Sequence, residues 1–423
     1  MVTRGDLRKS LIDWLEWFRK FSREFVPRQD VPSFQEGLCL ALTGVRRSGK
    51  TSLTVQIASN LKKSDSTFYF NFEDPLFFAG TDVTVIDTLL SIYQEYTGHT
   101  ATIVILDEVQ HVEGWERWVR KAVDTRQFQV IVTGSSSELL SSEIATSISG
   151  RVIESTVWPL SFIEYLRFHN KKPSSEGLYL RELDSFLHWG GFPKASLTVQ
   201  ESDRILLLKQ YLGDIVLRDV VARHKIKSQH SLQQLVTWYL TGVACPHSYT
   251  AVRKAFGMSI ELVSTLTEYL SQAFLVFEMT RYHANLKVQA RDSKKIYIVD
   301  SGLRTVSLLS EREDRGRLAE NCVYIELRRR KKEIFYFREE KEVDFLITEL
   351  GKPVEALQVA YSDLDDAKTR EREVSALVEC LDALGLKSGK ILTYSYEDQQ
   401  IINGHKIDFI PLYLWLGAPP QFI

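Results

Sequence analysis

The run Gly44 to Thr51, with the sequence GVRRSGKT, has the residue types and the spacing that hold nucleotide phosphates. Backbone N–H groups of a glycine-bracketed turn can converge on phosphate oxygens, Lys50 can meet the β- and γ-phosphates, and Thr51 can ligate Mg²⁺. The apolar run 38–42 predicts a buried strand before the loop, and 51–61 predicts a helix after it. We therefore expect ATP to bind to Gly44, Val45, Arg46, Arg47, Ser48, Gly49, Lys50, Thr51 and Ser52.

Two adjacent carboxylates end a second β-rich run, Thr102 to Glu108. Because neighbouring side chains of a strand point in different directions, Asp107 can hold Mg²⁺ while Glu108 polarises the attacking water. A strand over 67–72 and a helix over 85–96 are expected between this run and the loop. The carboxylate pair predicts hydrolysis rather than binding alone; a buried strand followed by an acidic cap is the alternative.

A further strand is predicted over 129–133, and it leads into Gly134 and three serines. Thr133 or Ser135 could orient the water beside the γ-phosphate; alternatively, the serines only turn the chain and cap a helix from Glu138. Arg151, at the start of another apolar run, is the candidate for an arginine that reaches a neighbouring subunit's γ-phosphate. Such a contact changes the rate by about 10³ to 10⁵. A salt bridge within the chain is the other interpretation.

The composition is that of an ordinary globular chain. At about 150 residues per domain, 423 residues predict about three domains, and the net charge of −2 excludes a chain-wide attraction to nucleic acid. Four cysteines lack metal-ligand spacing and are expected to be free thiols. No apolar run approaches the roughly 20 residues that cross a bilayer, so we expect a cytoplasmic protein without membrane association.

Several runs together resemble the archaeal and bacterial AAA-type ATPases that carry a C-terminal nuclease-like domain of the DUF4143 type. These runs are GVRRSGKTSL, ILDEVQ followed by Trp115, TGSSSELLSSEIATSISGR, WPLSFIEYL and WGGFPK, and the resemblance extends over most of the chain. It implies an α/β fold: a P-loop ATPase with a parallel sheet of order 5-1-4-3-2, a helical lid, a winged helix and a C-terminal PD-(D/E)xK-like α/β domain. ATP and Mg²⁺ are the implied cofactors, and a homo-oligomer, for which a hexameric ring is one arrangement, is the implied assembly.

The predicted domains are an N-terminal helix with the ATPase core, the lid, the winged helix and the nuclease-like domain, over 1–158, 159–227, 228–300 and 301–423. An apolar helical face within 7–25 is expected to dock on the ATPase sheet. In the lid, the loop from Trp189 to Pro193 predicts a tight interhelix turn, or else a relay of nucleotide state. Arg218 could contact the nucleotide, or could pair with Asp214 at i, i+4.

Helices over 231–240, 248–256 and 259–270 with strands over 274–279 and 295–299 predict the winged helix. Such domains often bind DNA, but the third helix carries two glutamates and no lysine or arginine, so it would repel phosphate. A packing or intersubunit role is therefore favoured. The flanking cations could still form a small phosphate-binding patch: Arg253, Lys254, Arg291, Lys294 and Lys295.

Part of a metal-nuclease pattern is present in the last domain. Glu320 and Asp344 match its first carboxylates, but neither Gln358 nor Glu355, taken as the next acid, is followed two residues later by the required lysine. We therefore expect an inactive nuclease-like domain. The run Arg328 to Lys332 offers either a cationic patch or a solvated helix end.

The leading hypothesis from the sequence is a Mg²⁺-dependent ATPase that couples turnover to DNA binding or remodelling. The alternative is a nucleotide-controlled switch or scaffold that recruits a protein partner.

Overall fold

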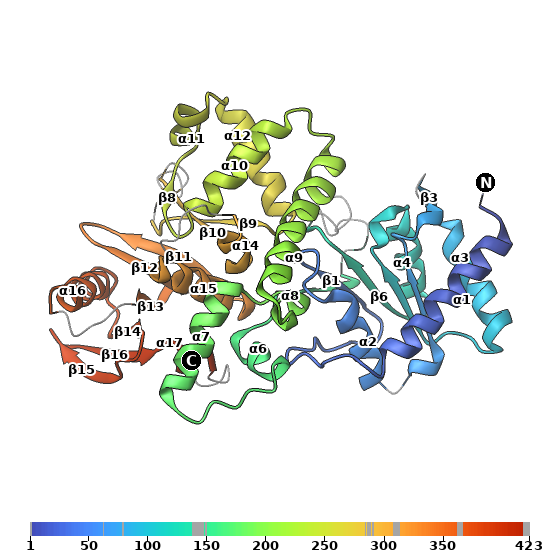
Figure 1. Cartoon of the computed structure of the whole chain (residues 1–423), viewed down its shortest axis with the longest axis horizontal. Helices are drawn as coiled ribbons and strands as arrows, with labels where there is room; N and C mark the ends of the chain where they lie inside the picture. Colours follow the sequence, from blue (N-terminus) through green and yellow to red (C-terminus); the bar gives the residue numbers. More distant parts are fainter. Residues whose placement is uncertain are drawn as a thin grey trace. The chain divides into compact units, whose positions relative to one another are not determined.

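In the computed structural model, the chain divides into two compact units, Met1–Val157 and Trp158–Ile423 (Figure 1). The structure describes residues 2–61, 63–77, 80–137, 148, 150–283, 285, 289, 292–307, 314–361 and 367–417. Arg291 and the helix predicted from Glu138 lie outside the described residues. The first unit ends one residue before the predicted end of the ATPase core; the finer division of the second unit stays a prediction.

A parallel sheet of five strands forms the centre of the first unit. Its strands are β1 (Cys39–Thr43), β2 (Thr67–Asn71), β4 (Ile103–Asp107), β6 (Gln129–Gly134) and β7 (Val152–Thr156). The strand order is β2-β4-β6-β1-β7. Counted along the chain, this is 2-3-4-1-5, which is the expected order 5-1-4-3-2 read from the other edge.

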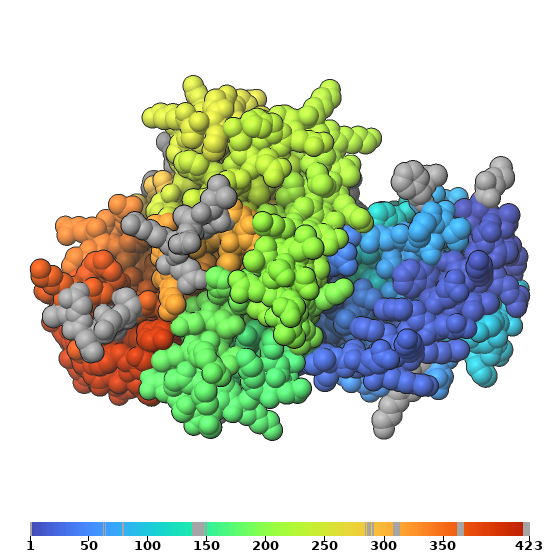
Figure 2. Space-filling view, viewed as in Figure 1, coloured from blue at the N-terminus to red at the C-terminus, as the bar shows by residue number. Residues whose placement is uncertain are grey.

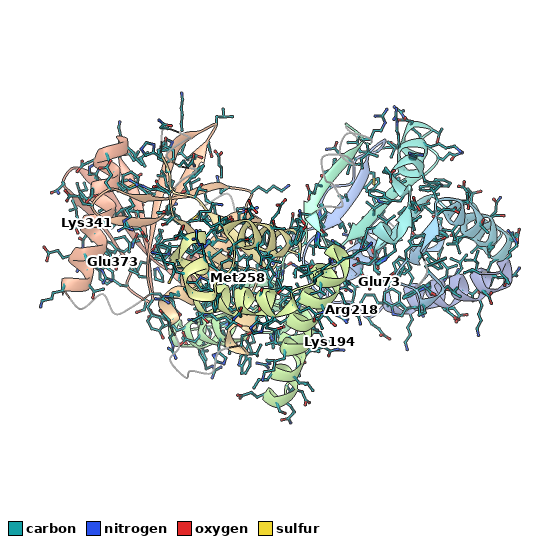
Figure 3. All side chains as sticks on the ribbon, turned by 90° about the horizontal axis from the view of Figure 1, so that it is seen from above. Glu73, Lys194, Arg218, Met258, Lys341 and Glu373 are labelled. Atoms are coloured by element: carbon teal, nitrogen blue, oxygen red, sulfur yellow. The ribbon has the colours of Figure 1, made fainter. Side chains whose placement is uncertain are left out.

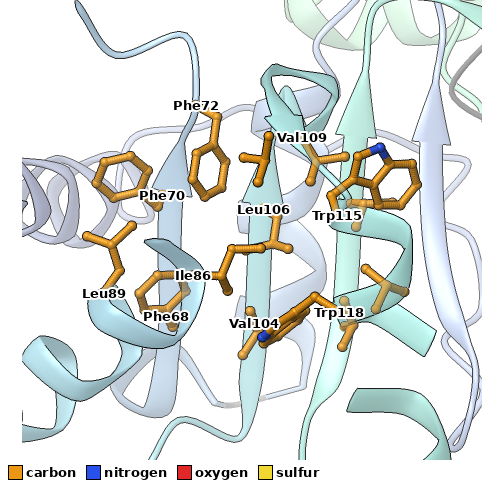
Figure 4. Packing of buried hydrophobic residues seen from close by; sticks show 14 of the residues in the cluster. Phe68, Phe70, Phe72, Ile86, Leu89, Val104, Leu106, Val109, Trp115 and Trp118 are labelled. Atoms are coloured by element: carbon orange, nitrogen blue, oxygen red, sulfur yellow. The ribbon is translucent and has the colours of Figure 1, made fainter. Parts of the chain in front are cut away.

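Four helices flank this sheet: α1 (Arg4–Phe21), α2 (Lys50–Asn60), α3 (Thr84–Thr97) and α4 (Trp115–Asp124). The shorter elements are η1 (Ser64–Ser66), η2 (Pro75–Phe77), β3 (Thr81–Asp82), η3 (Val109–His111) and β5 (Val112–Glu113). Alternate side chains of each strand enter two separate cores, so both faces of the sheet are buried. Phe68, Val104 and Leu106 pack with residues of α3 and α4 in one core (Figure 4). Tyr69 and Ile105 lie in the other core, with residues of α2.

Helix α1 docks on the sheet, as predicted. Its buried positions include Leu11, Leu15 and Phe18, and they recur at helical spacing on one face. A capping box between Thr3 and Asp6 fixes where the helix begins. The helix is placed against β2 and α3, and this packing brings its aromatic residues close to the end of β2.

The second unit begins with a run of helices. They are α6 (Phe162–Phe168), α7 (Glu176–Trp189), α8 (Pro193–Leu197), α9 (Glu201–Asp214) and the π-helix η5 (Ile215–Ala222). The predicted turn between α7 and α8 is confirmed, and glycine is required there. Gly190 has φ +75°, and a Cβ at this position would lie 1.8 Å from Asp300 Oδ1. Asp300 also accepts a hydrogen bond from the Gly191 N–H over 2.6 Å, so a residue far along the chain holds this turn.

Three helices and a small sheet follow, as the sequence predicts for residues 228–300. They are α10 (Gln229–Thr241), β8 (Pro246–His247), α11 (Tyr249–Phe256), α12 (Ile260–Gln272), β9 (Val276–Met279) and β10 (Lys294–Ile298). Helices α10, α11 and α12 pack on one another and form a lobe in the space-filling view (Figure 2). The sheet has the order β8-β10-β9.

The described residues of the C-terminal part of the chain form a mixed six-stranded sheet with the order β11-β12-β13-β14-β16-β15, together with four helices. Its elements are α14 (Ser301–Thr305), α15 (Arg315–Arg329), β11 (Glu333–Arg338), β12 (Glu342–Glu349), β13 (Lys352–Ala360), α16 (Ala367–Leu384), β14 (Ser388–Thr393), β15 (Asp398–Ile402), β16 (His405–Pro411) and α17 (Leu412–Gly417). Helix α16, which carries the Glu373 labelled in Figure 3, packs on β12, β13 and β14. Over the part of the chain that is described, no helix is both long and apolar enough to cross a membrane.

The two sheets of the second unit are joined by contacts between residues on either side of the predicted boundary at residue 300. Tyr336 of β11 forms an isolated parallel bridge with Arg281, just beyond β9. The Tyr336 N–H donates to Thr280 O over 3.2 Å, and the Tyr282 N–H donates to Tyr336 O over 2.7 Å. These hydrogen bonds connect the small sheet directly to the C-terminal sheet.

Candidate nucleotide-binding site

The loop between β1 and α2 adopts a backbone that few residue types tolerate. Gly44 has φ +138° and Gly49, the N-cap of α2, has φ +99°, whereas Arg47 is a non-glycine residue with φ +71°. A Cβ on Gly44 would lie 2.3 Å from the Val157 carbonyl oxygen. The glycines of the motif are therefore required by the fold, and the loop ends at the N-terminus of an 11-residue helix.

Lys50 folds back over this loop. Its Nζ donates to the carbonyl oxygens of Gly44 at 3.0 Å and Val45 at 3.3 Å, and lies 3.8 Å from Glu108 Oε1. Only 5% of the Lys50 side chain is exposed. The fold thus brings the lysine of the loop next to the second carboxylate of the β4 motif.

Asp107 is completely buried at the end of β4 and is held from three sides. Thr51 Oγ1 donates to Asp107 Oδ2 over 2.9 Å, and the Tyr69 hydroxyl donates to the same oxygen over 2.7 Å. Thr133 Oγ1 donates to Asp107 Oδ1. The two residues predicted to hold Mg²⁺, Thr51 and Asp107, are therefore direct neighbours.

Glu108 has an unusual backbone conformation for a residue that is not glycine, with φ +52° and ψ +48°. Its N–H donates to Thr133 Oγ1 over 3.0 Å, and its Oε2 accepts from Gln110 Nε2 over 2.7 Å. Non-glycine residues in this region carry strain that persists only where neighbouring contacts hold it. Here these two hydrogen bonds hold the strained backbone and the carboxylate.

The two adjacent carboxylates have pKa values shifted in opposite directions. Burial and the charge of Glu108 raise the pKa of Asp107, and the hydrogen bonds from Thr133, Tyr69 and Thr51 offset only part of this rise. Burial also acts to raise the pKa of Glu108, but the charge of Lys50 and the hydrogen bond from Gln110 lower it overall. Opposed environments of this kind are what a metal-binding group and an ionised base require.

The residues present fit a nucleotide with its metal ion. Ser48 Oγ is buried and has no hydrogen-bond partner among the described residues, so a polar atom of the loop is left to be satisfied by a ligand. It lies beside the helix N-terminus, where anions bind favourably. ATP phosphates would be held by the loop and Lys50, and Mg²⁺ by Thr51 and Asp107.

Two residues that support this site were missed by the sequence reading. Arg28 is buried, and its Nη1 donates to Ser48 O over 2.9 Å, while its backbone pairs with the side-chain amide of Gln56 on α2 at 2.8 and 2.9 Å. Tyr69 connects Asp107 to the aromatic residues of α1, since its ring lies 5.2 Å from that of Phe18. Neither residue belongs to a local motif, so nothing in the sequence near them indicated their positions.

The other predicted site residues lie at varied distances from this centre. Thr133 is part of it, and Ser135 is buried at the end of β6. Arg46 is turned to Glu73, with 2.7 Å between Nη1 and Oε1, and Arg151 is paired with Asp124 over 2.6 Å. The predicted pairing of Arg218 (Figure 3) with Asp214 is confirmed, at 3.5 Å.

Two expectations about cationic patches are wrong in part, although Arg253, Lys254, Arg328 and Lys331 are exposed. Lys295 is 1% exposed and points into a carboxylate cluster instead of a surface patch, and Lys294 is paired with Glu278 over 2.6 Å. In the run 328–332, Arg329 and Arg330 are buried and bind Glu326 at 3.1 and 2.9 Å. Ion pairs and packing therefore occupy several cations that we expected on the surface from the sequence.

The parallel sheet, the phosphate-type loop and the paired carboxylates define the first unit as a P-loop ATPase domain of the AAA class. A family model described as an AAA domain matches residues 37–166, and two models described as domains of unknown function, DUF8612 and DUF4143, match residues 180–314 and 315–415. An uncharacterized protein of Methanocaldococcus jannaschii is 34% identical over 399 residues, which are 88% of this chain and 86% of that protein. The chain belongs to the archaeal and bacterial AAA-type ATPases with a C-terminal DUF4143 domain, so the predicted resemblance is confirmed.

Other comparisons extend over similar shares of the chain. An uncharacterized protein of Haemophilus influenzae is 28% identical over 403 residues, 92% of this chain and 97% of that protein. The structure of the Aeropyrum pernix ORC1 protein in complex with DNA covers 77% of this chain and 94% of that chain, at 13% identity and a TM-score of 0.33. The structure of Cdc6p from Pyrobaculum aerophilum covers 72% and 97%, at 13% identity and a TM-score of 0.29.

Proposed function

We propose that the first unit binds ATP with Mg²⁺ and hydrolyses it. The observation that carries this proposal is the arrangement of Lys50, Thr51, Asp107 and Glu108, in which Thr51 and Asp107 are 2.9 Å apart and Lys50 and Glu108 are 3.8 Å apart. A metal-binding pair thus lies beside a lysine and an ionised carboxylate.

Each group has a separate task in the proposed reaction. Lys50 leaves its loop carbonyls to meet the β- and γ-phosphates. Thr51 and Asp107 would hold Mg²⁺, and a bound Mg²⁺ would supply positive charge against the developing charge on the phosphates. Glu108, whose pKa is lowered, accepts a hydrogen bond from the attacking water and orients it in line with the bond that breaks. Thr133 keeps the Asp107 carboxylate and the Glu108 backbone in place.

We place Arg151 at an interface with another copy of the chain. Its side chain is 32% exposed and bound to Asp124, and that exchangeable surface pair could open when a neighbouring γ-phosphate arrives. Mixing Arg151→Ala with Lys50→Ala protein tests this role. A shared site regains turnover above that of either variant alone, because the intact nucleotide site of an Arg151→Ala copy can then lie next to the intact arginine of a Lys50→Ala copy.

The proposed use of turnover is DNA binding or remodelling. The three helices α10 to α12 and the sheet β8-β10-β9 follow the order of a winged helix, and such domains commonly insert their third helix into a DNA groove. Arg253 and Lys254, in the last turn of α11, supply local positive charge.

A second candidate, a switch that recruits a protein, is supported by the third helix itself. Helix α12 (IELVSTLTEYLSQ) carries Glu261 and Glu268 without a lysine or arginine, and Ile260 at its start is 42% exposed. An acidic helix with an exposed apolar residue suits a protein surface better than a phosphate backbone.

The test is the steady-state ATP hydrolysis rate of the full chain with Mg²⁺, with and without single-stranded, duplex and four-way-branched DNA. Lys50→Ala protein controls for contaminating ATPase. Stimulation by one form of DNA supports the DNA-coupled function, whereas hydrolysis that no DNA changes, together with no DNA binding at low salt, favours the protein-directed switch. No hydrolysis above the Lys50→Ala level overturns the proposed reaction itself.

A further inference from the structure

A buried ammonium group lies at the centre of a carboxylate cluster in the second unit. Lys295 Nζ is 2.9 Å from each of three oxygens, which belong to Glu320, Glu342 and Asp344. An ammonium group has three N–H donors, so these three carboxylates satisfy all of them with charge-assisted hydrogen bonds. The exposed fractions of the Lys295, Glu320 and Asp344 side chains are only 2%, 12% and 11%.

The lysine and the carboxylates come from different parts of the fold. Lys295 belongs to β10 of the small sheet, whereas Glu320 lies on α15 and Asp344 on β12. The Tyr297 hydroxyl, also from β10, donates to Glu320 Oε1 over 2.7 Å. The Asn321 side chain pairs with both the N–H and the C=O of Ile298, at 2.8 and 3.0 Å. Polar contacts from one strand thus attach β10 to the C-terminal domain.

The position predicted for the second nuclease carboxylate is also satisfied internally. Gln358 Oε1 accepts from the Asp344 N–H over 3.1 Å, and Gln358 Nε2 donates to Glu373 over 2.6 Å. Asp344 Oδ2 accepts from the Val359 N–H over 3.0 Å. A glutamate in place of Gln358 would set two carboxylates against each other, so the neutral amide suits this arrangement.

The lysine and the carboxylates of the cluster shift each other's pKa values. Burial alone would lower the pKa of Lys295, but the charges of Asp344, Glu320 and Glu342 raise it well above its ordinary value. Burial and the charge of Asp344 raise the pKa of Glu320 to about 8. The lysine therefore stays charged at neutral pH, and the raised pKa of Glu320 reflects its burial and the negative charge gathered around it.

We propose that Lys295 is the resident cation of this cluster: its ammonium group takes the place that a metal ion has in a nuclease and ties the small sheet to the C-terminal domain. This goes beyond the proposed ATPase function and does not depend on it. The lysine that the local motif lacks is present, but it comes from another strand and is closed off from a nucleic-acid backbone by its burial. Over the described residues, no group of three or more His, Cys, Asp or Glu side chains is arranged to hold a metal ion.

The test compares full-length variants by hydrogen exchange in β10 and α15. Removing one partner of a buried ion cluster is strongly destabilising, whereas replacing the charged groups together is often tolerated. Lys295→Met should therefore speed exchange in these two elements at least about 10-fold, since it leaves the carboxylates unpaired. The triple variant Lys295→Met/Glu320→Gln/Asp344→Asn should recover most of the protection. Lys294→Met, on the same strand β10, removes a partly exposed ion pair with Glu278 and is the matched control; it should speed exchange in β10 much less than Lys295→Met and leave α15 unchanged.

Equal exchange in Lys295→Met and Lys294→Met would overturn the proposal, and so would a triple variant no better protected than Lys295→Met. If Lys295→Met does not fold, a soluble triple variant supports the proposal. The remaining measurement uses Mn²⁺ without nucleotide. Mn²⁺ would be shown to bind in the cluster if it slowed exchange in β10 and α15 of the native chain and of Lys50→Ala, but not of Asp344→Asn. That result would overturn the proposal, and exchange that Mn²⁺ does not change supports it.

Discussion

The Glu108 N–H donates to Thr133 Oγ1 over 3.0 Å, and the same hydroxyl donates to Asp107, so one side chain of β6 holds the carboxylate of Asp107 and the backbone of Glu108. Thr133→Val keeps the shape but leaves a buried N–H and a buried carboxylate oxygen without partners. We expect the Mg²⁺ concentration for half-maximal hydrolysis to rise about 10-fold or more, and kcat to fall. Steady-state kinetics over a Mg²⁺ series checks this. Thr133→Ser retains the hydroxyl and should behave like the native chain; native kinetics in Thr133→Val would contradict the role.

Glu108→Gln separates binding from turnover. The amide preserves the side-chain shape but cannot act as an ionised base, so kcat should fall about 10² to 10⁴-fold. Binding of a fluorescent ATP analogue should persist, and Lys50→Ala should abolish it. Normal turnover in Glu108→Gln would remove this residue from the proposed catalytic set.

Tyr69→Phe removes one of the four side-chain hydrogen bonds to Asp107, the fourth being from Asn71 Nδ2 at 3.4 Å, and leaves the aromatic packing with α1 in place. Partners that orient a metal ligand typically change metal affinity by about 10 to 100-fold. We expect the Mg²⁺ requirement to rise toward that range while the thermal stability changes little. Phe18→Leu on α1 is the matched control, because it alters packing on Tyr69 without touching its hydroxyl. An unchanged Mg²⁺ requirement in Tyr69→Phe would show that Thr51 and Thr133 suffice.

Arg28→Met tests the support of the phosphate loop. The guanidinium group donates to the Ser48 carbonyl oxygen. In a trans peptide the N–H of the next residue, Gly49, points away from that oxygen, so fixing the carbonyl group also fixes the direction of this N–H. We expect loss of this contact to weaken binding of an ATP analogue about 10-fold, measured by fluorescence titration, and to raise KM more than it lowers kcat. Arg28→Lys should restore part of the affinity. Equal losses in Arg28→Lys and Arg28→Met would indicate a role in packing alone.

The ionisation of Asp300 should make the stability of the second unit depend on pH. Its burial raises the pKa to about 7, although the N–H groups of Gly191 and Gly302 donate to it. The unfolded chain releases this proton near pH 4 and the folded chain near pH 7, so the folded state binds the extra proton between these values. The free energy of unfolding should therefore fall as the pH rises through this window, by up to about 1.4 kcal/mol per pH unit, and level off above it.

Thermal unfolding between pH 4 and pH 8 checks this dependence. Added Mg-ATP should shift only the unfolding transition of the first unit, so the transition that does not shift belongs to the second unit. Asp300→Asn should lower the stability at every pH, because an amide oxygen and nitrogen cannot accept from two N–H groups, and should remove this part of the slope. A slope that is the same in both proteins would show that Asp300 is ionised throughout.

Local sequence was enough to predict the strands of the parallel sheet and helices α1, α2 and α3 of the ATPase domain, whereas α4 was not predicted. Runs of apolar residues between turns predicted each strand of the parallel sheet, and the motifs at the ends of β1 and β4 predicted that Lys50, Thr51, Asp107 and Glu108 would meet. They meet because parallel strands of one sheet bring their carboxyl ends to the same edge. Strand order followed from the family resemblance and agrees with the sheet in the structure.

Local sequence could not predict which distant side chains complete each site. Arg28 reaches the phosphate loop because the segment after α1 is bound to Gln56 of α2, and Tyr69 reaches Asp107 because β2 pairs with β4. Lys295 reaches Asp344 because the two sheets of the second unit are joined at Tyr336. A motif contains only residues that are neighbours along the chain. Such motifs were enough to predict the phosphate loop and the paired carboxylates. The tertiary structure decided whether a charged residue such as Lys295 faces solvent or is buried among partners, because long-range packing sets both the distance to those partners and the loss of water.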